Sequence, residues 1–156
     1  MAVRCGVCGE LNSQVLRPES TYIEIDQISY CRFCVAEVIQ EKIKFIKATT
    51  TNSFDGYYIE EYLDIESVEV VPGTGIFSEM FADVDDFLGS NVTSFEKKLR
   101  KAKKAALDRL KMLAYNIGGN AVVGVDIDYT EFSSNRVGVV VNGTIVRLKP
   151  NDELNS

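Results

Sequence analysis

The stretch SFEKKLRKAKKAALDRLKMLAYNIGGNAVVGVDIDY, residues 94–129, joins a helix pattern directly to a strand pattern. Apolar residues recur every three or four positions from Phe95 to Ile117, which predicts one long amphipathic helix. Gly118-Gly119-Asn120 supplies a helix stop. From Ala121 to Tyr129 every second residue is apolar, which predicts a strand. The helical stripe consists of Phe95, Leu99, Ala102, Ala106, Leu110, Leu113 and Ile117.

Strand patterns lie on both sides of this stretch. Before it, residues 57–65 alternate, and the parity changes near Glu66-Ser67, which predicts a bulge or a turn between two strands. After it, residues 137–148 change parity at Asn142-Gly143, which fits either a hairpin turn or a bulge inside one long strand. Residues 76–92 show helical spacing broken by a glycine. The order β-β-α-β-β predicts an α+β fold with one long helix on an antiparallel sheet.

All four cysteines precede this domain, as two C-x2-C pairs: Cys5 with Cys8, and Cys31 with Cys34. Four thiolates in this spacing predict a structural zinc site, one ion per chain, with no open coordination position. Gly9 follows the first pair and can take the positive φ that such a turn requires. Between the pairs we expect a hairpin with a turn at residues 18–20 and a second strand at 21–25. A helix follows, with its apolar positions at Val35, Val38, Ile39, Ile43 and Ile46.

This order of knuckle, hairpin and cysteine pair before a helix resembles a treble-clef zinc finger, and the resemblance extends only to the ligand role of the cysteines. Bound iron and a thiol redox switch are alternatives to zinc. The module has six basic and six acidic residues in 1–47, so nucleic-acid binding is not expected. We expect metal removal to unfold it, because a unit this small has a marginal hydrophobic core.

Composition excludes several classes of protein. The chain has 156 residues, a net charge of −6 and no histidine, so a Ser-His-Asp triad, a Cys-His nucleophile pair and a His-ligated zinc are impossible. No apolar run approaches the ~20 residues of a membrane helix, and no signal-peptide pattern is present. Paired cysteines without such a signal favour a reducing compartment. We therefore expect a cytoplasmic protein without a membrane partner.

Several segments resemble the YbjQ-like family over residues 49–149. The specific part is the run from Gly118 to Tyr129, and the family pattern prefers alanine where this chain has Gly119. The other matching segments are 54–59, 61–63, 96–102 and 143–144. The resemblance implies a small α/β domain that assembles into homo-oligomeric rings, expected to be pentamers, with a heavy-metal-binding label and no known function. From residue 35 onward the chain has no cysteine or histidine, so we assign the soft metal to the cysteine module.

Charge is segregated along the chain. Residues 54–86 contain acids and no base, whereas the long helix is basic, which indicates either solvated faces or complementary surfaces between subunits. Asp126 and Asp128 share one face of a strand and could bind a cation or act as acid and base, but they fit exposed strand residues, or hydrogen-bond partners at a subunit contact, better.

These observations predict three parts: a zinc module at 1–48, an oligomerisation domain at 49–150 and a disordered tail at 151–156. The expected function is non-enzymatic, with a ring that displays zinc modules for contact with another protein. The alternative is an enzyme or small-ligand sensor that uses an acidic pocket between subunits.

Overall fold

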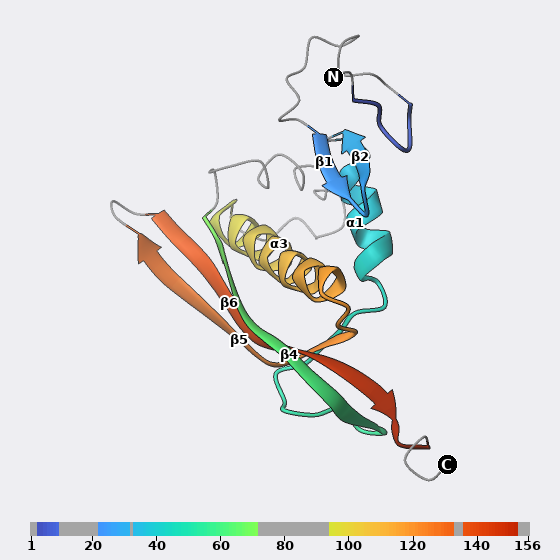
Figure 1. The fold of residues 1–156 in the computed structure, drawn as a ribbon. Coiled ribbons are helices and arrows are strands. Elements are labelled where there is room, and N and C mark those ends of the chain that lie inside the picture. The colour runs from blue at the N-terminus through green and yellow to red at the C-terminus, as the bar shows by residue number, and fades with distance from the viewer. Residues whose placement is uncertain (1–2, 10–21, 32, 72–93, 133–135, 153–156) are drawn as a thin grey trace. The chain divides into compact units, whose positions relative to one another are not determined.

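The computed structural model describes residues 3–9, 22–31, 33–71, 94–132 and 136–152 (Figure 1). The chain divides into two compact units, Met1–Glu41 and Lys42–Ser156. The described residues form a two-stranded hairpin, a four-stranded mixed sheet and two helices, which confirms the predicted α+β class. The helical pattern predicted at 76–92 lies outside the described residues.

The first unit contains an antiparallel hairpin of β1 (Tyr22–Ile25) and β2 (Ile28–Cys31). Its turn is Asp26-Gln27, whose φ angles of 52° and 65° both lie in the left-handed region. Two such residues give the strand twist that a two-residue hairpin needs. The turn has no glycine, so the sequence pattern did not indicate it, and the turn predicted at 18–20 lies outside the described residues.

The first helix, α1 (Val35–Ile43), follows the second cysteine pair and has the predicted apolar spacing. Val35, Ile39 and Ile43 are buried, and Ile46 is buried just beyond the helix end. Glu37 in the first turn and Lys42 in the last turn match the helix dipole.

The sheet of the second unit has the strand order β3-β5-β6-β4 (Figure 1). Its strands are β3 (Lys47–Ala48), β4 (Tyr57–Val70), β5 (Ala121–Phe132) and β6 (Arg136–Pro150). β3 runs parallel to β5, and the other pairs are antiparallel. The sheet is therefore mixed, and the antiparallel arrangement predicted from sequence holds for β4, β5 and β6 but not for β3.

The long helix α3 (Ser94–Asn116) packs on one face of this sheet. Its buried positions are mostly alanines, which let the helix approach the strands closely. Ile117, predicted as the last core position, is 44% exposed because the helix ends at Asn116. Leu99 and Leu113 are half-buried. The buried apolar positions are Ala102, Ala105, Ala106, Leu110 and Ala114, and Asp108 is also buried.

The sequence pattern predicted a single alternation along β5, but the alternation is interrupted in the structure. The register of β5 with β6 shifts by one residue between Val123 and Asp126, and Gly124 adopts a φ of 60° there. This bulge turns Ala121 and Val123 to one face and Ile127 to the other. The segment before β4 is bound at the same point, because the Gly124 N–H donates to the Thr51 carbonyl at 2.9 Å.

β6 is one continuous strand, so the hairpin alternative at Asn142-Gly143 is wrong. The extra residue of the bulge lies in β5, opposite these positions, rather than in β6. The parity change in β6 has another cause: Val139 and Val141 are buried on one face, while Val146 and Leu148 are buried on the other. On that second face they pack with Ala121, Val123, Phe54, Tyr57 and Ile59.

β4 is also one strand, and its irregularities occur earlier than predicted. The register with β6 shifts between Ile59 and Glu61 and again between Tyr62 and Asp64, whereas the pairing near Glu66-Ser67 is regular. Each shift leaves one extra residue in β4. β4 is an edge strand of the sheet, where bulges are common.

The ends of the predicted parts also differ from the structure. Residues 47–48, assigned from sequence to the zinc module, form β3 and pair with β5. At the other end, the Asn151 N–H donates to the Gly56 carbonyl at 3.0 Å, so this residue of the predicted tail is hydrogen-bonded. Residues 153–156 lie outside the described residues.

Candidate metal centre

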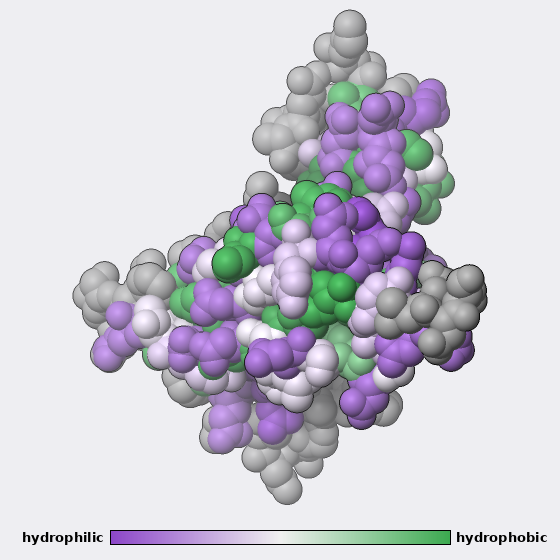
Figure 2. Space-filling model, turned by 60° about the horizontal axis from the view of Figure 1, so that its bottom comes forward, coloured by the Kyte–Doolittle hydropathy of each residue, from purple (hydrophilic) through white to green (hydrophobic). Residues whose placement is uncertain are grey.

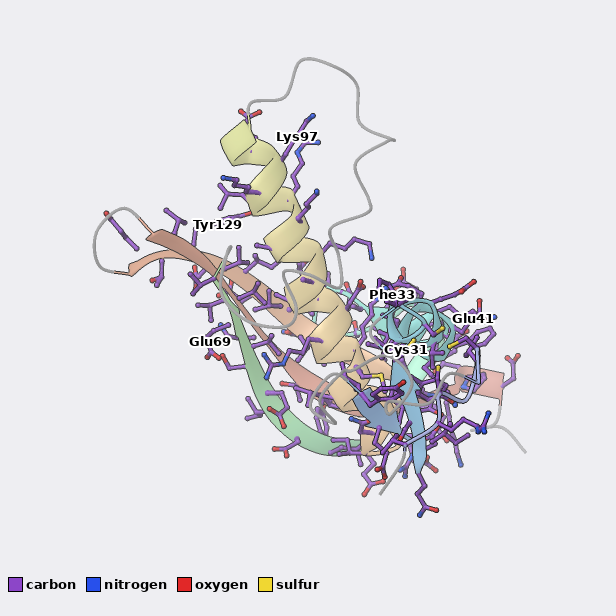
Figure 3. All side chains as sticks on the ribbon, turned by 90° about the horizontal axis from the view of Figure 1, so that it is seen from above. Cys31, Phe33, Glu41, Glu69, Lys97 and Tyr129 are labelled. Atoms are coloured by element: carbon purple, nitrogen blue, oxygen red, sulfur yellow. The ribbon has the colours of Figure 1, made fainter. Side chains whose placement is uncertain are left out.

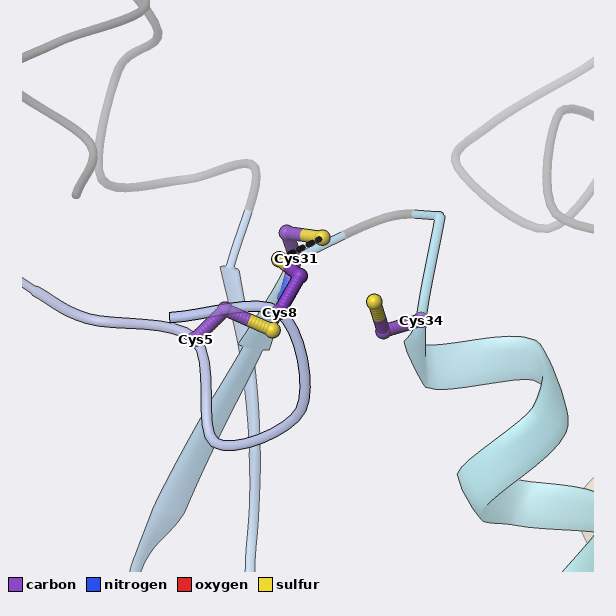
Figure 4. Close-up of side chains that lie close together, drawn as sticks. All are labelled: Cys5, Cys8, Cys31 and Cys34. Atoms are coloured by element: carbon purple, nitrogen blue, oxygen red, sulfur yellow. Dashed lines mark hydrogen bonds between the residues drawn. The ribbon is translucent and has the colours of Figure 1, made fainter. Parts of the chain in front are cut away.

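The four cysteines of the two C-x2-C pairs converge in the first unit (Figure 4). Their sulfur atoms all lie within 4.8 Å of one another, and none of them is in a disulfide. The structure thus brings together the four residues predicted as zinc ligands: Cys5, Cys8, Cys31 and Cys34.

The first pair is held in a tight turn. Gly9 closes the turn with a φ of 72°, as its position predicted, and its N–H donates to the Cys5 carbonyl at 3.0 Å. Arg4 adds a second closure, with Nη1 donating to the Gly9 carbonyl at 2.8 Å. Gly6 lies against β2, and a Cβ there would be 2.4 Å from Cγ2 of Ile28.

The second pair links the hairpin to the helix. Cys31 is the last residue of β2, and Cys34 immediately precedes α1. The Cys34 N–H donates to the Cys31 carbonyl at 3.0 Å, which closes a turn over the second pair. The Val38 N–H donates to the Cys34 carbonyl at 3.2 Å, so this ligand is fixed to the first turn of α1.

Backbone donors stabilise one thiolate in particular. The Cys31 N–H donates to Cys5 Sγ at 3.4 Å. Burial raises the pKa of the Cys5 thiol, but hydrogen bonds from the backbone N–H groups of Cys31, Cys8 and Val7 outweigh this effect and lower it to about 6. These donors are backbone groups, so no side-chain pattern in the sequence could have identified them.

Cys34 behaves in the opposite way. Burial raises its pKa, and hydrogen bonds shared with the sulfurs of Cys31, Cys8 and Cys5 raise it further, to about 12. In the metal-free cluster, Cys5 therefore ionises at a much lower pH than Cys34. A metal ion that requires four thiolates must displace protons, so its affinity falls as pH falls.

The cluster fits a tetrahedral metal. Cys8 Sγ and Cys31 Sγ are 3.8 Å apart, close to the roughly 3.8 Å edge of a tetrahedron with Zn–S bonds of about 2.3 Å. All four donors are sulfur, which suits soft or borderline ions. Four protein ligands would leave no position for substrate or water on a tetrahedral ion.

Asp126 and Asp128 are exposed strand residues on a common face, as their spacing predicted. In the part of the chain that the structure describes, the cysteines form the one group of three or more His, Cys, Asp or Glu residues with ligand atoms close enough to hold a metal. The two aspartates belong to no such group. Neither described helix has a long enough apolar run to cross a lipid bilayer.

Comparison with known proteins matches residues 46–149 to the YbjQ family, whose description reads "Putative heavy-metal-binding". A UPF0145 protein of Bacillus cereus is 41% identical over 100 residues, which cover 64% of this chain and 97% of that protein. A UPF0145 protein of Bacillus thuringiensis is 40% identical over the same shares. All four cysteines precede the matched range, and that range contains no cysteine or histidine.

Similar solved structures include a protein of unknown function from Pediococcus pentosaceus. It is 18% identical, and the match covers 67% of this chain and 98% of that one. The TM-score of 0.37 is too low for this likeness to support an argument.

Proposed function

Because this chain belongs to the YbjQ family through residues 46–149 and has a cluster of four cysteines before that range, we propose that it is a non-enzymatic assembly protein that displays a structural zinc module. The observation that carries the proposal is the convergence of four sulfurs within 4.8 Å of one another. One zinc ion per chain would be held by Cys5, Cys8, Cys31 and Cys34. The family domain would form the homo-oligomer, a ring that we expect to be a pentamer.

Zinc is favoured over other ions by the donor set and by the lack of an open position. When bound, Zn²⁺ would cross-link the first turn, β2 and the start of α1. The described part of this unit has two four-residue strands and a short helix, so such a cross-link would supply much of its stability. Reduced thiols also require a reducing compartment, so we place the protein in the cytoplasm.

A protein partner suits the module better than a nucleic acid. Residues 1–47 have no excess of basic side chains, and four thiolates around one Zn²⁺ would add negative charge. Apolar side chains are exposed at both cysteine turns: Val7 is 59% exposed and Phe33 is 63% exposed. Exposed apolar residues of this kind support contact with another protein. Repeating a weak contact around a ring raises avidity without strengthening any single contact.

Metal analysis of the purified chain tests the zinc site. We expect one zinc per chain, and we expect Cys31→Ser to lose it because a hydroxyl is a poor substitute for a buried thiolate. Val7→Ala is the matched control, since it lies in the first cysteine turn but offers no ligand. Zinc retained by Cys31→Ser, or lost by Val7→Ala, would contradict the assignment.

Native mass spectrometry of the same samples tests the assembly. We expect a closed homo-oligomer, with five copies as the specific prediction, and a zinc count equal to the number of chains. A monomer at micromolar concentration would reject the ring and leave the zinc assignment standing.

A further inference from the structure

The sheet of the second unit has one face under α3 and another that is partly open. Gly143 marks the covered face, because a Cβ at this position would lie 3.3 Å from Cδ2 of Leu110 on α3. Residues directly opposite one another on neighbouring strands share a face. Side chains alternate along a strand, so Val140, Asn142 and Thr144 of β6 face away from the side that Gly143 marks. Their partners on the neighbouring strands share this open face: Asp126 and Ser67 opposite Asn142, Asp128 and Glu69 opposite Val140, and Ile65 opposite Thr144.

This open face exposes large apolar side chains on β4, the strand at the edge of the sheet. Ile65 is 78% exposed and Tyr62 is 70% exposed. Figure 2 brings the lower side of Figure 1 forward and shows hydrophobic surface among hydrophilic surface on the molecule. An edge strand with exposed apolar residues is a surface that proteins usually cover.

The same face is acidic. β4 contains five acids and no base, but the register places Glu61, Asp64 and Glu66 opposite residues of the covered face, so Glu69 is the β4 acid that contributes to the open face. Glu60 forms an ion pair with Lys149, and Glu61 forms one with Arg147. On the open face itself, Glu69, Asp126 and Asp128 are exposed, and two bases of β6, at positions 147 and 149, are held in the ion pairs just named. The open face therefore suits a cationic partner.

The opposite side of the same unit carries the complementary charge. α3 has eight bases and two acids between residues 94 and 116, and Lys98 and Arg100 are exposed. Figure 3 shows Lys97 near the start of α3 and Glu69 on β4, apart from each other. Because the sheet lies between the helix and the open face, these two surfaces cannot meet within one chain.

We propose that the open face of one copy, built from Tyr62, Ile65, Glu69, Asp126 and Asp128, binds the basic surface of α3 in a second copy. This inference rests on the proposed function, because it names the contact by which the homo-oligomer forms. The two surfaces differ, so the contact is heterologous, and each copy offers one of each. Repetition of such a contact closes a ring when the rotation between copies permits it. Complementary charge sets which surfaces meet, and the apolar side chains supply burial.

A charge swap tests this contact. Glu69→Lys with Asp128→Lys makes the open face basic, and Lys98→Glu with Arg100→Glu makes the helix acidic. Each pair alone places like charges together, so we expect about tenfold or greater weakening of self-association in sedimentation velocity. All four substitutions in one chain restore opposite charges, so we expect association to recover. Glu24→Lys with Asp55→Lys is the control, with the same charge change on exposed positions elsewhere.

Circular dichroism of each variant checks that it is folded. The contact is wrong, although the oligomer exists, if the parent associates and the folded double variants associate equally well. It is also wrong if the variant with all four substitutions associates as weakly as the double variants. Association of the parent that is insensitive to high salt would also overturn it. A monomeric parent would reject the proposed oligomer itself and this contact with it.

Discussion

Asn120 shows how much one polar side chain contributes to this fold. Its Nδ2 donates to the Leu148 carbonyl at 2.9 Å, and its Oδ1 accepts from the Leu148 N–H at 2.7 Å. Its own carbonyl accepts from the Lys47 N–H at 3.1 Å. The last residue of the helix stop therefore joins β3, β5 and β6, a role that its place in a Gly-Gly-Asn sequence did not indicate.

Replacing this side chain should be costly. We expect Asn120→Ala to lower the free energy of unfolding by about 1–3 kcal/mol, because the Leu148 backbone groups lose their partners in a half-buried site. Asn120→Asp should also destabilise, since a carboxylate cannot donate to the Leu148 carbonyl. Urea denaturation monitored by circular dichroism measures both.

Asn116→Ala, at the exposed end of α3, is the control and should change the free energy of unfolding little. Equal effects at positions 116 and 120 would show that the side-chain bonds to Leu148 are unimportant.

The family pattern prefers alanine at position 119, and the structure shows why glycine suits this chain. A Cβ here would lie 2.5 Å from Cγ2 of Ile145 and 3.2 Å from the Ala114 carbonyl oxygen. Glycine therefore accommodates the close approach of the helix end to β6. A chain with alanine at this position would need Ile145 to shift or to be smaller.

At the scale of elements, the hairpin and α1 depend on the cysteine cluster. The two strands have four residues each and α1 has nine, lengths at which neither a hairpin nor a helix is stable alone in water. Cys31 ends one strand and Cys34 precedes the helix, so a metal bound there would connect both elements.

Metal removal should therefore unfold these elements selectively. We expect a chelator to abolish hydrogen-exchange protection in residues 22–41 while β5, β6 and α3 stay protected, because comparable zinc sites contribute about 10 kcal/mol or more to folding. Hydrogen exchange with mass spectrometry resolves the two regions in one experiment. Added zinc should restore the protection, and unchanged protection after complete metal loss would refute the structural role.

For the whole molecule, the distribution of ligands separates metal binding from assembly. Every cysteine lies before residue 35, whereas the residues matched to the family, 46–149, have no soft ligand. The acidic open face and the basic helix both belong to the second unit. The proposed assembly therefore has no direct need for the metal.

We accordingly expect the chelated chain to keep the oligomeric mass of the zinc-bound chain. Light scattering during size-exclusion chromatography, with metal content measured on the same fractions, tests this expectation. Dissociation that follows zinc loss and reverses on zinc addition would show that the cysteine module contributes to the subunit contact.

The sequence by itself determined the α+β class, the two helices, and the four residues of the cysteine cluster. These features depend on periodicity and on ligand spacing, which are local properties of the chain. Where an element buries a single face, as α1 does, the apolar spacing identified the buried residues correctly. The preference of the cluster for a soft or borderline metal ion also follows from its donor atoms, because thiolate chemistry does not depend on the rest of the fold.

Only the tertiary structure decided how the strands pair. The bulges in β4 shift the parity of the strand without a glycine to mark them, and Gly124 marks the bulge in β5 inside an alternation that reads as unbroken. β6 is buried on both faces, so its alternation could not separate a turn from a continuous strand. β3 is too short to have a pattern, and its pairing depends on the distant residues of β5. The lowered pKa of Cys5 likewise depends on backbone N–H groups that only folding brings to the sulfur.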